Sequence, residues 1–223
     1  MKTAQRSART DGEATRARIL ETAGELFAAG GVAETTSKAI AAQAGVDLAS
    51  INYHFGSRSG LYQAVLIEAH RRLVDFADLR QLADNPMPAT DKLAALLDQL
   101  VERATLGSEG WHLTVLAAEL LAPSSHLEVL LQSEVPMKKS LVIAILMEIT
   151  GIPANDPALL RCLLSVAAPC LVLLIGRRGI PGPLQEVRSM PRAAIVDHLH
   201  RFAMAGLKAV ARDYARQRKA RAP

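Results

Sequence analysis

The chain contains 223 residues and has a formal net charge of +4; half of its residues are hydrophobic and only 4% are aromatic. This length allows one small and one larger domain, each with its own core. Alanine and leucine predominate over β-branched runs, which excludes a strand-rich fold and predicts an all-α protein. The two cysteines, Cys162 and Cys170, would lie about 12 Å apart along one helix, too far for a disulfide. With no recognisable signal peptide, we expect reduced thiols in a cytoplasmic protein.

The first eighteen residues are basic, with five cations (Lys2, Arg6, Arg9, Arg16 and Arg18) against only Asp11 and Glu13. This arm either contacts DNA phosphates or is a solvated, frayed terminus. Apolar residues from Ile19 to Phe27 then recur at helical spacing. They predict a helix over about 11–29 that ends at Gly30-Gly31.

Residues 36–56 carry the signals of a helix, a tight turn and a second short helix. Thr36 or Ser37 can cap the first helix, and Gly45 supplies the positive φ that ends it. Asp47 caps the second helix, which covers about residues 48–54. Small and apolar residues would close the shared core at the steep crossing of a helix-turn-helix, namely Ile40, Ala41, Ala44, Val46, Ile51 and Phe55.

The second of these helices turns an unusual set of side chains toward solvent. Asn52 can pair bidentately with adenine, Leu48 or Ala49 can meet a thymine methyl group, and tyrosine or histidine can reach phosphate. We therefore predict that this helix lies in the major groove of double-stranded DNA. The predicted DNA-binding residues of the motif are Thr36, Ser37, Lys38, Asp47, Leu48, Ala49, Ser50, Asn52, Tyr53 and His54.

The stretch TTSKAIAAQAGVDLASINYHFGSRSGLY, residues 35–62, resembles the N-terminal domain of TetR-family transcriptional repressors. The hallmarks are AGV, a short recognition helix that ends in Tyr-His-Phe, and FGS followed by a basic residue. The likeness covers about the first third of the chain. Further on, ELLAPSS and LLRCLLSVAAPCL resemble the C-terminal domain of the CecR-type branch of that family.

The resemblance implies a repressor that binds a palindromic operator as a homodimer and is released by a small-molecule inducer of unknown identity. It also implies that Arg58, which begins the next helix, contacts phosphate. Residues 1–56 would then form the DNA-binding domain with its basic arm, and residues 57–223 a larger helical domain for ligand binding and dimerisation. No cofactor is expected. Leu48 and Asn52 depart from the residues usual in the family, so the operator sequence does not follow from relatives.

The rest of the chain predicts further helices, about nine in total. The expected helices cover about 57–76, a segment from residue 90, 109–122, 125–150, a segment from residue 157, and 192–216. The segment DNPMPAT, residues 84–90, is the first clear break. Ser125 and Glu128 form a capping box, and Pro136 is expected to kink the helix that follows it.

The most apolar segment, residues 162–175, contains Ser165 and Pro169 and is shorter than the roughly 20 residues of a membrane span. A helix that is apolar on all sides must instead be covered by protein. Together with the last helix it predicts a four-helix dimer interface, although a core helix of a monomer is the alternative. The predicted interface residues are Leu163, Val166, Cys170, Leu174, Val196, Leu199, Ala203, Leu207 and Val210.

Ligand contacts are predicted for residues on the helices that wall the pocket in the resembling family: Trp111, His112, Val115, Glu119, Met137 and Met147. Core packing or surface exposure is the alternative for each of them. His198 and His200 stand two residues apart on a helix and face opposite sides, so no metal site is expected. No catalytic motif is found, and we expect no enzyme. A nonspecific DNA-binding or scaffold protein without an inducer remains the alternative function.

Overall fold

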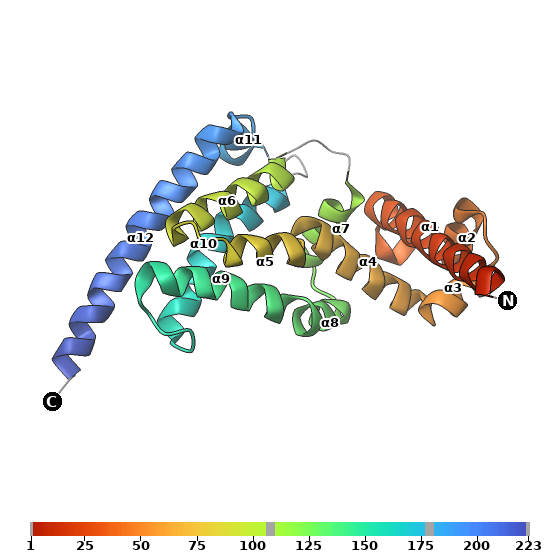
Figure 1. The fold of residues 1–223 in the computed structure, drawn as a ribbon. Coiled ribbons are helices and arrows are strands. Elements are labelled where there is room, and N and C mark those ends of the chain that lie inside the picture. The colour runs from red at the N-terminus through yellow and green to blue at the C-terminus, as the bar shows by residue number, and fades with distance from the viewer. Residues whose placement is uncertain (1, 106–109, 177–180, 222–223) are drawn as a thin grey trace. The chain divides into compact units, whose positions relative to one another are not determined.

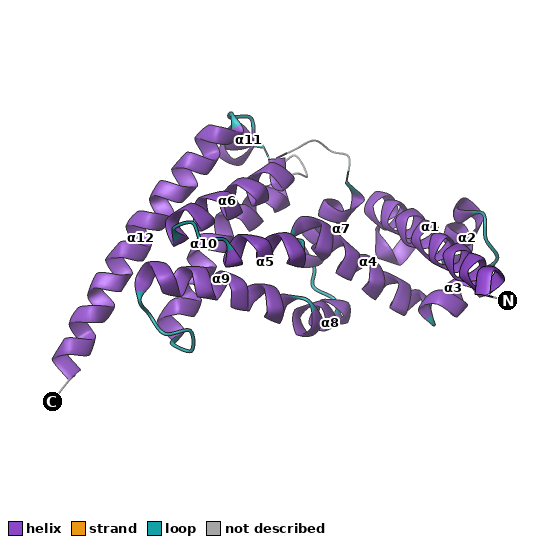
Figure 2. Ribbon diagram, viewed as in Figure 1, coloured by secondary structure: helices purple, strands orange, loops and turns teal. Residues whose placement is uncertain are grey.

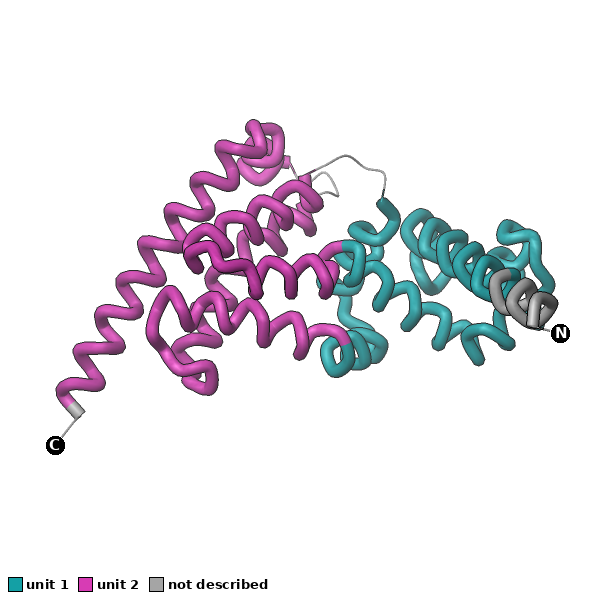
Figure 3. Tube along the Cα trace, viewed as in Figure 1, with its two compact units in different colours: residues 1–72, 109–133 teal, residues 73–108, 134–223 magenta. Residues whose placement is uncertain are grey.

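The computed structural model describes residues 2–105, 110–176 and 181–221, and within these ranges the side chains of residues 11–220. All of the regular structure in these ranges is helical, in twelve helices labelled α1 to α12 (Figures 1 and 2). The chain divides into two compact units (Figure 3). Unit 1 comprises residues 1–72 and 109–133, and unit 2 comprises residues 73–108 and 134–223. The all-α prediction is confirmed.

Unit 1 consists of six helices: α1 (Lys2–Glu34), α2 (Ser37–Ala44), α3 (Leu48–Phe55), α4 (Arg58–Leu73), α7 (Trp111–Leu121) and α8 (Ser125–Ser133). Helix α1 packs against α2 and α7, and α2 packs against α3. Fully buried side chains such as Ile19, Ile40 and Ile51 join the first three helices, while Leu61 and Leu66 contribute the buried face of α4. The inward spacing predicted for residues 19–55 therefore holds.

The end of α1 lies near the predicted position. Gly31 has φ 78° and ψ 163°, which is not helical and which only glycine adopts without strain. Thr35, which is buried, donates its hydroxyl to the carbonyl of Gly31 at 2.8 Å. The helix begins earlier than predicted, at Lys2, and one further turn follows Gly31 as far as Glu34.

Unit 2 consists of the remaining helices: α5 (Phe76–Asp84), α6 (Ala89–Thr105), α9 (Val135–Thr150), α10 (Pro157–Ile175), α11 (Pro183–Arg188) and α12 (Arg192–Arg221). Helix α6 packs against α12, α10, α9 and α5. The main core joins Leu93 and Leu97 of α6 to Leu146 of α9, Leu159 of α10 and Leu207 of α12.

Three differences explain why the described residues form twelve helices and not about nine. The helix predicted over 57–76 is broken before Phe76, because the Asp75 carboxylate accepts hydrogen bonds from the amides of Ala77 and Asp78 and starts α5. The helix predicted over 125–150 is broken at Glu134, so Pro136 lies in the first turn of α9 and does not kink a longer helix. A further helix, α11, lies before the helix predicted from residue 192, where the sequence predicts none; residues 177–180, which precede it, lie outside the described ranges.

The predicted boundary between residues 56 and 57 falls inside unit 1, because α4 carries buried residues of the same core as α1 to α3. Tyr62 of α4 contacts Phe27 of α1 edge to face at 5.1 Å. The compact unit thus contains α4, α7 and α8 in addition to the helix-turn-helix. The functional division into a DNA-binding and a ligand-binding domain at this position stays a prediction.

Within the described residues, α10 is long and apolar enough to cross a membrane, and the α7–α8 pair, bent by 113°, would be a second candidate if it counted as one span. The helix has 19 residues, five more than the predicted apolar run of residues 162–175, so its length alone does not exclude a membrane span. A core helix has the same length and composition, however, and Leu159, Cys162, Val166 and Cys170 all lie in the core of unit 2.

Candidate nucleic-acid interface

Local hydrogen bonds fix the two helices of the helix-turn-helix. Of the two predicted caps of α2, Thr36 is the one used, since its hydroxyl accepts from the amide of Ala39 at 3.1 Å. Gly45 ends α2 in the left-handed region with φ 63°. Asp47 caps α3 through the amide and the hydroxyl of Ser50, at 2.7 and 2.6 Å. These two hydrogen bonds, that of the hydroxyl first, lower the pKa of the Asp47 carboxyl, so the cap is charged at neutral pH.

The outer face of α3 has the composition that the sequence predicts. Tyr53 is 85% exposed and Leu48 49% exposed, and Ala49 and Asn52 are also exposed, whereas Ile51 is fully buried. Ser50 and His54 are half-buried; the hydroxyl of Ser50 is held by Asp47, and the His54 ring lies 4.9 Å from that of Tyr53. Lys38 of α2 is exposed and Ser37 half-buried.

The side chain of Arg58 has internal partners. Its Nε donates to the carbonyl of Thr35 at 2.9 Å, and its Nη2 donates to the carbonyl of Val32. The Val32 carbonyl lies in the last turn of α1, where a helix leaves backbone acceptors without intrahelical donors, and the Thr35 carbonyl directly follows that turn. Arg58 therefore ties the start of α4 to the end of α1, a role that no local sequence signal indicates. Its predicted phosphate contact stays a prediction.

We predict that Arg58→Met lowers the free energy of unfolding by about 1–2 kcal/mol, because two charge-assisted hydrogen bonds to partly buried carbonyls are lost. Urea unfolding of the isolated protein measures this loss. The salt dependence of DNA binding supplies the control: the slope of log K against log salt should stay unchanged. A slope reduced by about one per subunit would instead show that Arg58 contacts a phosphate.

A cation on α1 also lies against the end of the recognition helix. The Arg16 guanidinium stands 5.0 Å from the centre of the Phe55 ring, in the geometry of a cation–π contact. Arg16 is exposed, so its charge lies at the surface beside α3. The sequence suggests this cation only as part of a basic arm; the side chains of the earlier members, up to residue 10, lie outside the described residues.

The predicted ligand contacts fall into two groups. Trp111, Val115 and Glu119 are buried in unit 1, whereas Met137 and Met147 of α9 are 51% and 40% exposed in unit 2. The fourth residue of unit 1, His112, is half-buried. Glu119 is committed to internal hydrogen bonds, accepting from Tyr62 Oη at 2.7 Å and from the amide and hydroxyl of Ser124. A ligand contact by these residues stays a prediction.

The hydroxyl of Tyr62 is a permanent donor in this network. Burial, followed by the hydrogen bond and the charge of Glu119, raises the pKa of Tyr62 well above its usual value. Its ring also contacts His126 edge to face at 5.1 Å, and His126 Nε2 lies 2.8 Å from Ser59 Oγ. Helices α4, α7 and α8 are thus joined by one chain of polar contacts.

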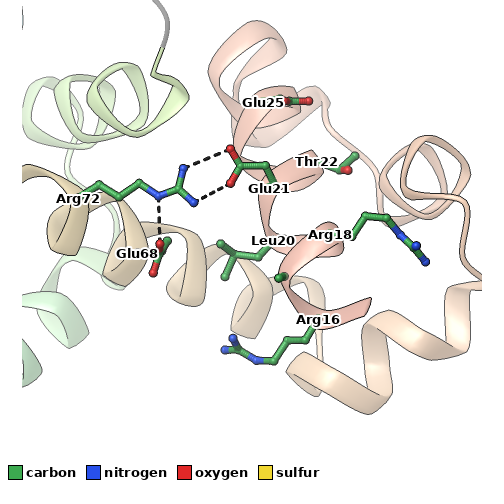
Figure 4. Close-up of a pocket in the computed structure, with 9 residues that line it drawn as sticks. Arg16, Arg18, Leu20, Glu21, Thr22, Glu25, Glu68 and Arg72 are labelled. Atoms are coloured by element: carbon green, nitrogen blue, oxygen red, sulfur yellow. Dashed lines mark hydrogen bonds and ion pairs between the residues drawn. The ribbon is translucent and has the colours of Figure 1, made fainter. Parts of the chain in front are cut away.

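A second cluster joins α1, α4 and α7. Figure 4 shows its members on α1 and α4, which line a hollow of unit 1. Arg72 of α4 makes two hydrogen bonds to Glu21 of α1, at 2.7 and 3.2 Å, and a third to Glu68 at 3.0 Å. Trp111 donates its indole N–H to Glu21 at 2.8 Å, and the Arg72 guanidinium lies 4.9 Å from the indole centre. Hydrogen bonds from Arg72 first, and then Trp111, lower the pKa of Glu21.

The residues predicted for the dimer interface mostly face the core of their own unit. Val166, Cys170, Leu174 and Leu207 are buried, with exposed fractions of 7% or less. Four others are half-buried against this core: Leu163, Val196, Leu199 and Ala203. Only Val210, at 39%, is exposed. The predicted interface residues thus form an inward stripe, the apolar residues of α10 and α12 that face the core of unit 2. Hydrophobic spacing cannot distinguish the inner face of a helix from an apolar outer face.

The outer faces of α10 and α12 carry other large apolar residues. On α10 these are Leu160, Leu164, Leu171 and Val172, and on α12 Phe202, which is 74% exposed. The Phe202 ring stacks on His198 at 6.2 Å. Among the described residues no cluster of histidine, cysteine and acidic side chains has the arrangement of a metal site.

Comparisons with known proteins agree with this geometry. The model of bacterial regulatory proteins of the tetR family matches residues 19–65, and the model of the C-terminal domain of the HTH-type transcriptional dual regulator CecR matches residues 89–207. No curated protein matches the chain.

Similar solved structures include the fatty acid degradation regulator FadR from Bacillus halodurans, with 16% identity, a TM-score of 0.67, and coverage of 87% of this chain and 96% of that chain. A tetR-family regulator from Streptomyces coelicolor has 20% identity and a TM-score of 0.63 over 93% and 86% of the two chains. NalD, the secondary repressor of the MexAB-OprM multidrug efflux pump in Pseudomonas aeruginosa, has 21% identity and a TM-score of 0.58 over 88% and 97%. At these identities the likeness shows a common fold.

The helical fold and its capped helix-turn-helix define a DNA-binding transcriptional regulator. The chain belongs to the TetR family, and the part matched by the CecR-type C-terminal domain is more than half of it.

Proposed function

We propose that this protein is a ligand-responsive repressor that binds a palindromic operator as a homodimer in the cytoplasm and is released by a small molecule. The observation that carries the proposal is the outer face of α3, where Tyr53 is 85% and Leu48 49% exposed next to the amide of Asn52. Apolar and aromatic groups exposed beside a bidentate hydrogen-bonding group are suited to base edges in a major groove.

In this mechanism the caps of the motif hold α3 rigid, so that little conformational freedom is lost on DNA. Asn52 would read adenine, Leu48 and Ala49 would contact thymine methyl groups, and Tyr53 would reach the backbone. Lys38, exposed on α2, would contact phosphate. Arg58 would act indirectly, by holding α4 on the end of α1.

Dimerisation is proposed through the outer faces of α10 and α12, and not through the inward stripe. Leu164 is 64% and Phe202 74% exposed, and on α10 Leu160 and Val172 extend the same apolar surface. An isologous pairing of these helices gives a two-fold axis, and this symmetry is the reason to expect an operator with two matching half-sites.

Release by a ligand follows from linkage. A small molecule that binds more tightly to a conformer whose two α3 helices are wrongly spaced for the operator must lower operator affinity by the same differential free energy. A cytoplasmic location is supported by Cys162 and Cys170, both free and buried. Burial raises the pKa of the Cys170 thiol to about 11, so it remains a thiol at neutral pH.

The test is a fluorescence-anisotropy titration with DNA that flanks the protein's own gene, beside a shuffled duplex, at two salt concentrations. A preference of about a thousandfold or more at physiological salt is expected for a specific regulator. Equal, salt-sensitive binding to both duplexes would favour the alternative, a nonspecific DNA-binding or scaffold protein.

Base reading is tested at a single residue. Asn52→Ala should relax the preference at one base position by about 1–3 kcal/mol, since the bidentate pair with adenine is lost. Binding to a set of operators that each carry one substituted base pair measures this. Lys38→Ala is the matched control, because the loss of a phosphate contact weakens binding to every operator alike. If Asn52→Ala also loses only uniform affinity, the assignment of Asn52 to base reading is wrong.

A further inference from the structure

Trp111, the sole tryptophan of the chain, lies flat on a glycine of α1. A Cβ atom at Gly24 would overlap the indole, only 2.5 Å from Cε2 and from Cε3. Gly24 is itself buried in the middle of α1. Glycine is less favourable than alanine at such a helical position, and close approach of another group is one of its uses there.

The same indole is held by polar groups from two helices. Its N–H donates to Glu21, one turn before Gly24 on α1, and its ring is covered by the Arg72 guanidinium of α4, which also pairs with Glu21. The side chain thus contacts both α1 and α4. These are the helices that precede and follow α2 and α3, so Trp111 connects α7 to both ends of the helix-turn-helix.

We propose that Trp111 is a positioning residue for operator binding: its indole, seated on Gly24, holds α1 and α4 in the arrangement that presents α3 to DNA. This inference rests on the proposed function and specifies how α3 is regulated. A signal that moves α7 and lifts the indole from Gly24 lowers operator affinity. By reciprocity, operator DNA stabilises the seated indole by the same factor.

The fluorescence of Trp111 reports directly on whether the indole is packed against Gly24. A buried indole emits at shorter wavelength than a hydrated one and is less accessible to acrylamide. Adding operator duplex to the wild-type protein should therefore reduce acrylamide quenching of Trp111, and adding the shuffled duplex should not. A purely structural role of Trp111 would give no difference between the two duplexes.

The decisive variant is Gly24→Ala, with Gly12→Ala as its matched control in the same helix. A Cβ at Gly12 meets nothing within 4 Å, whereas a Cβ at Gly24 meets the indole. We expect Gly24→Ala to shift the Trp111 emission to longer wavelength and to weaken operator binding tenfold or more. Gly12→Ala should change neither property. Helix propensity alone predicts that both alanines are neutral or favourable, so it cannot produce this result.

Two results with Gly24→Ala would overturn the proposal: a displaced indole with full operator affinity, or an unchanged emission with full affinity. If circular dichroism shows that this variant is unfolded, Trp111→Leu takes its place, and full operator affinity of that folded variant overturns the proposal. The wild-type titration separates the two levels of inference. If the wild-type protein binds the operator and the shuffled duplex equally well, the proposed function is wrong as well. If the wild-type protein prefers the operator and Gly24→Ala binds it with unchanged affinity, only the positioning role of Trp111 is wrong.

Discussion

The double variant Leu164→Glu/Phe202→Glu is expected to be a folded monomer that binds the operator at least about a hundredfold more weakly than wild type. Both side chains lie mostly in solvent on the described unit, at 64% and 74% exposure, so glutamate at either position leaves the core intact. In the proposed dimer each glutamate would be desolvated without a partner charge, which costs several kcal/mol per site. A single recognition helix then makes half of the contacts of the palindrome.

Sedimentation equilibrium gives the mass of the variant, and anisotropy on the operator gives its affinity. Leu131→Glu is the control, because Leu131 is also an exposed leucine, at 50%, and lies on α8 of unit 1. This variant should remain a dimer with unchanged affinity. If the double variant stays dimeric at micromolar concentration, the proposed face of α10 and α12 is incorrect.

The inward stripe gives a contrasting result that separates the two faces. Val166→Ala removes two methyl groups from a side chain that is only 7% exposed in the core of unit 2. Its effect should be on the free energy of unfolding and not on the dimer constant. The comparison matters because both faces of α10 are apolar, and their sequence spacing is equally helical.

Local signals predicted the helix-turn-helix well. The cap at Asp47 and the left-handed glycine at position 45 act over a few residues, and both are found where the sequence indicates them. A local signal was also available at Asp75, which starts α5, but the continuous apolar stripe from Leu61 to Phe76 concealed the break. Hydrophobic spacing records which residues are apolar and does not record whether one helix or two present them.

Contacts between distant residues could not be predicted in this way. Arg58 donates to carbonyls 23 and 26 residues earlier, a contact that its position at a helix start does not indicate. Trp111 meets Glu21 across 90 residues of sequence. Nothing in the sequence near Gly24 indicates that an indole covers it. The contacts that the sequence could not predict are therefore tertiary ones, which join side chains to partners far away along the chain.

Glu119→Ala is expected to lower the free energy of unfolding by about 2–4 kcal/mol, the largest loss we predict from a single polar residue. The Glu119 side chain is buried, with an exposed fraction of 3%, and accepts from Tyr62 Oη, Ser124 N and Ser124 Oγ at 2.6–2.8 Å. Alanine leaves a buried phenol hydroxyl without this acceptor and also creates a cavity. Urea unfolding in the absence of DNA measures the loss.

Two comparisons make the result specific to the link between α4 and α7. Glu128→Ala, on the exposed side of α8, removes a hydrogen bond from Gln132 and a negative charge from the first turn of the helix, and should cost less than about 1 kcal/mol. Tyr62→Phe removes the other partner of the buried bond. Because Glu119→Ala and Tyr62→Phe break the same interaction, the double variant should be more stable than the sum of the single losses implies. Strict additivity, or a Glu119→Ala variant as stable as Glu128→Ala, would mean that the buried carboxylate does not hold α7 on α4.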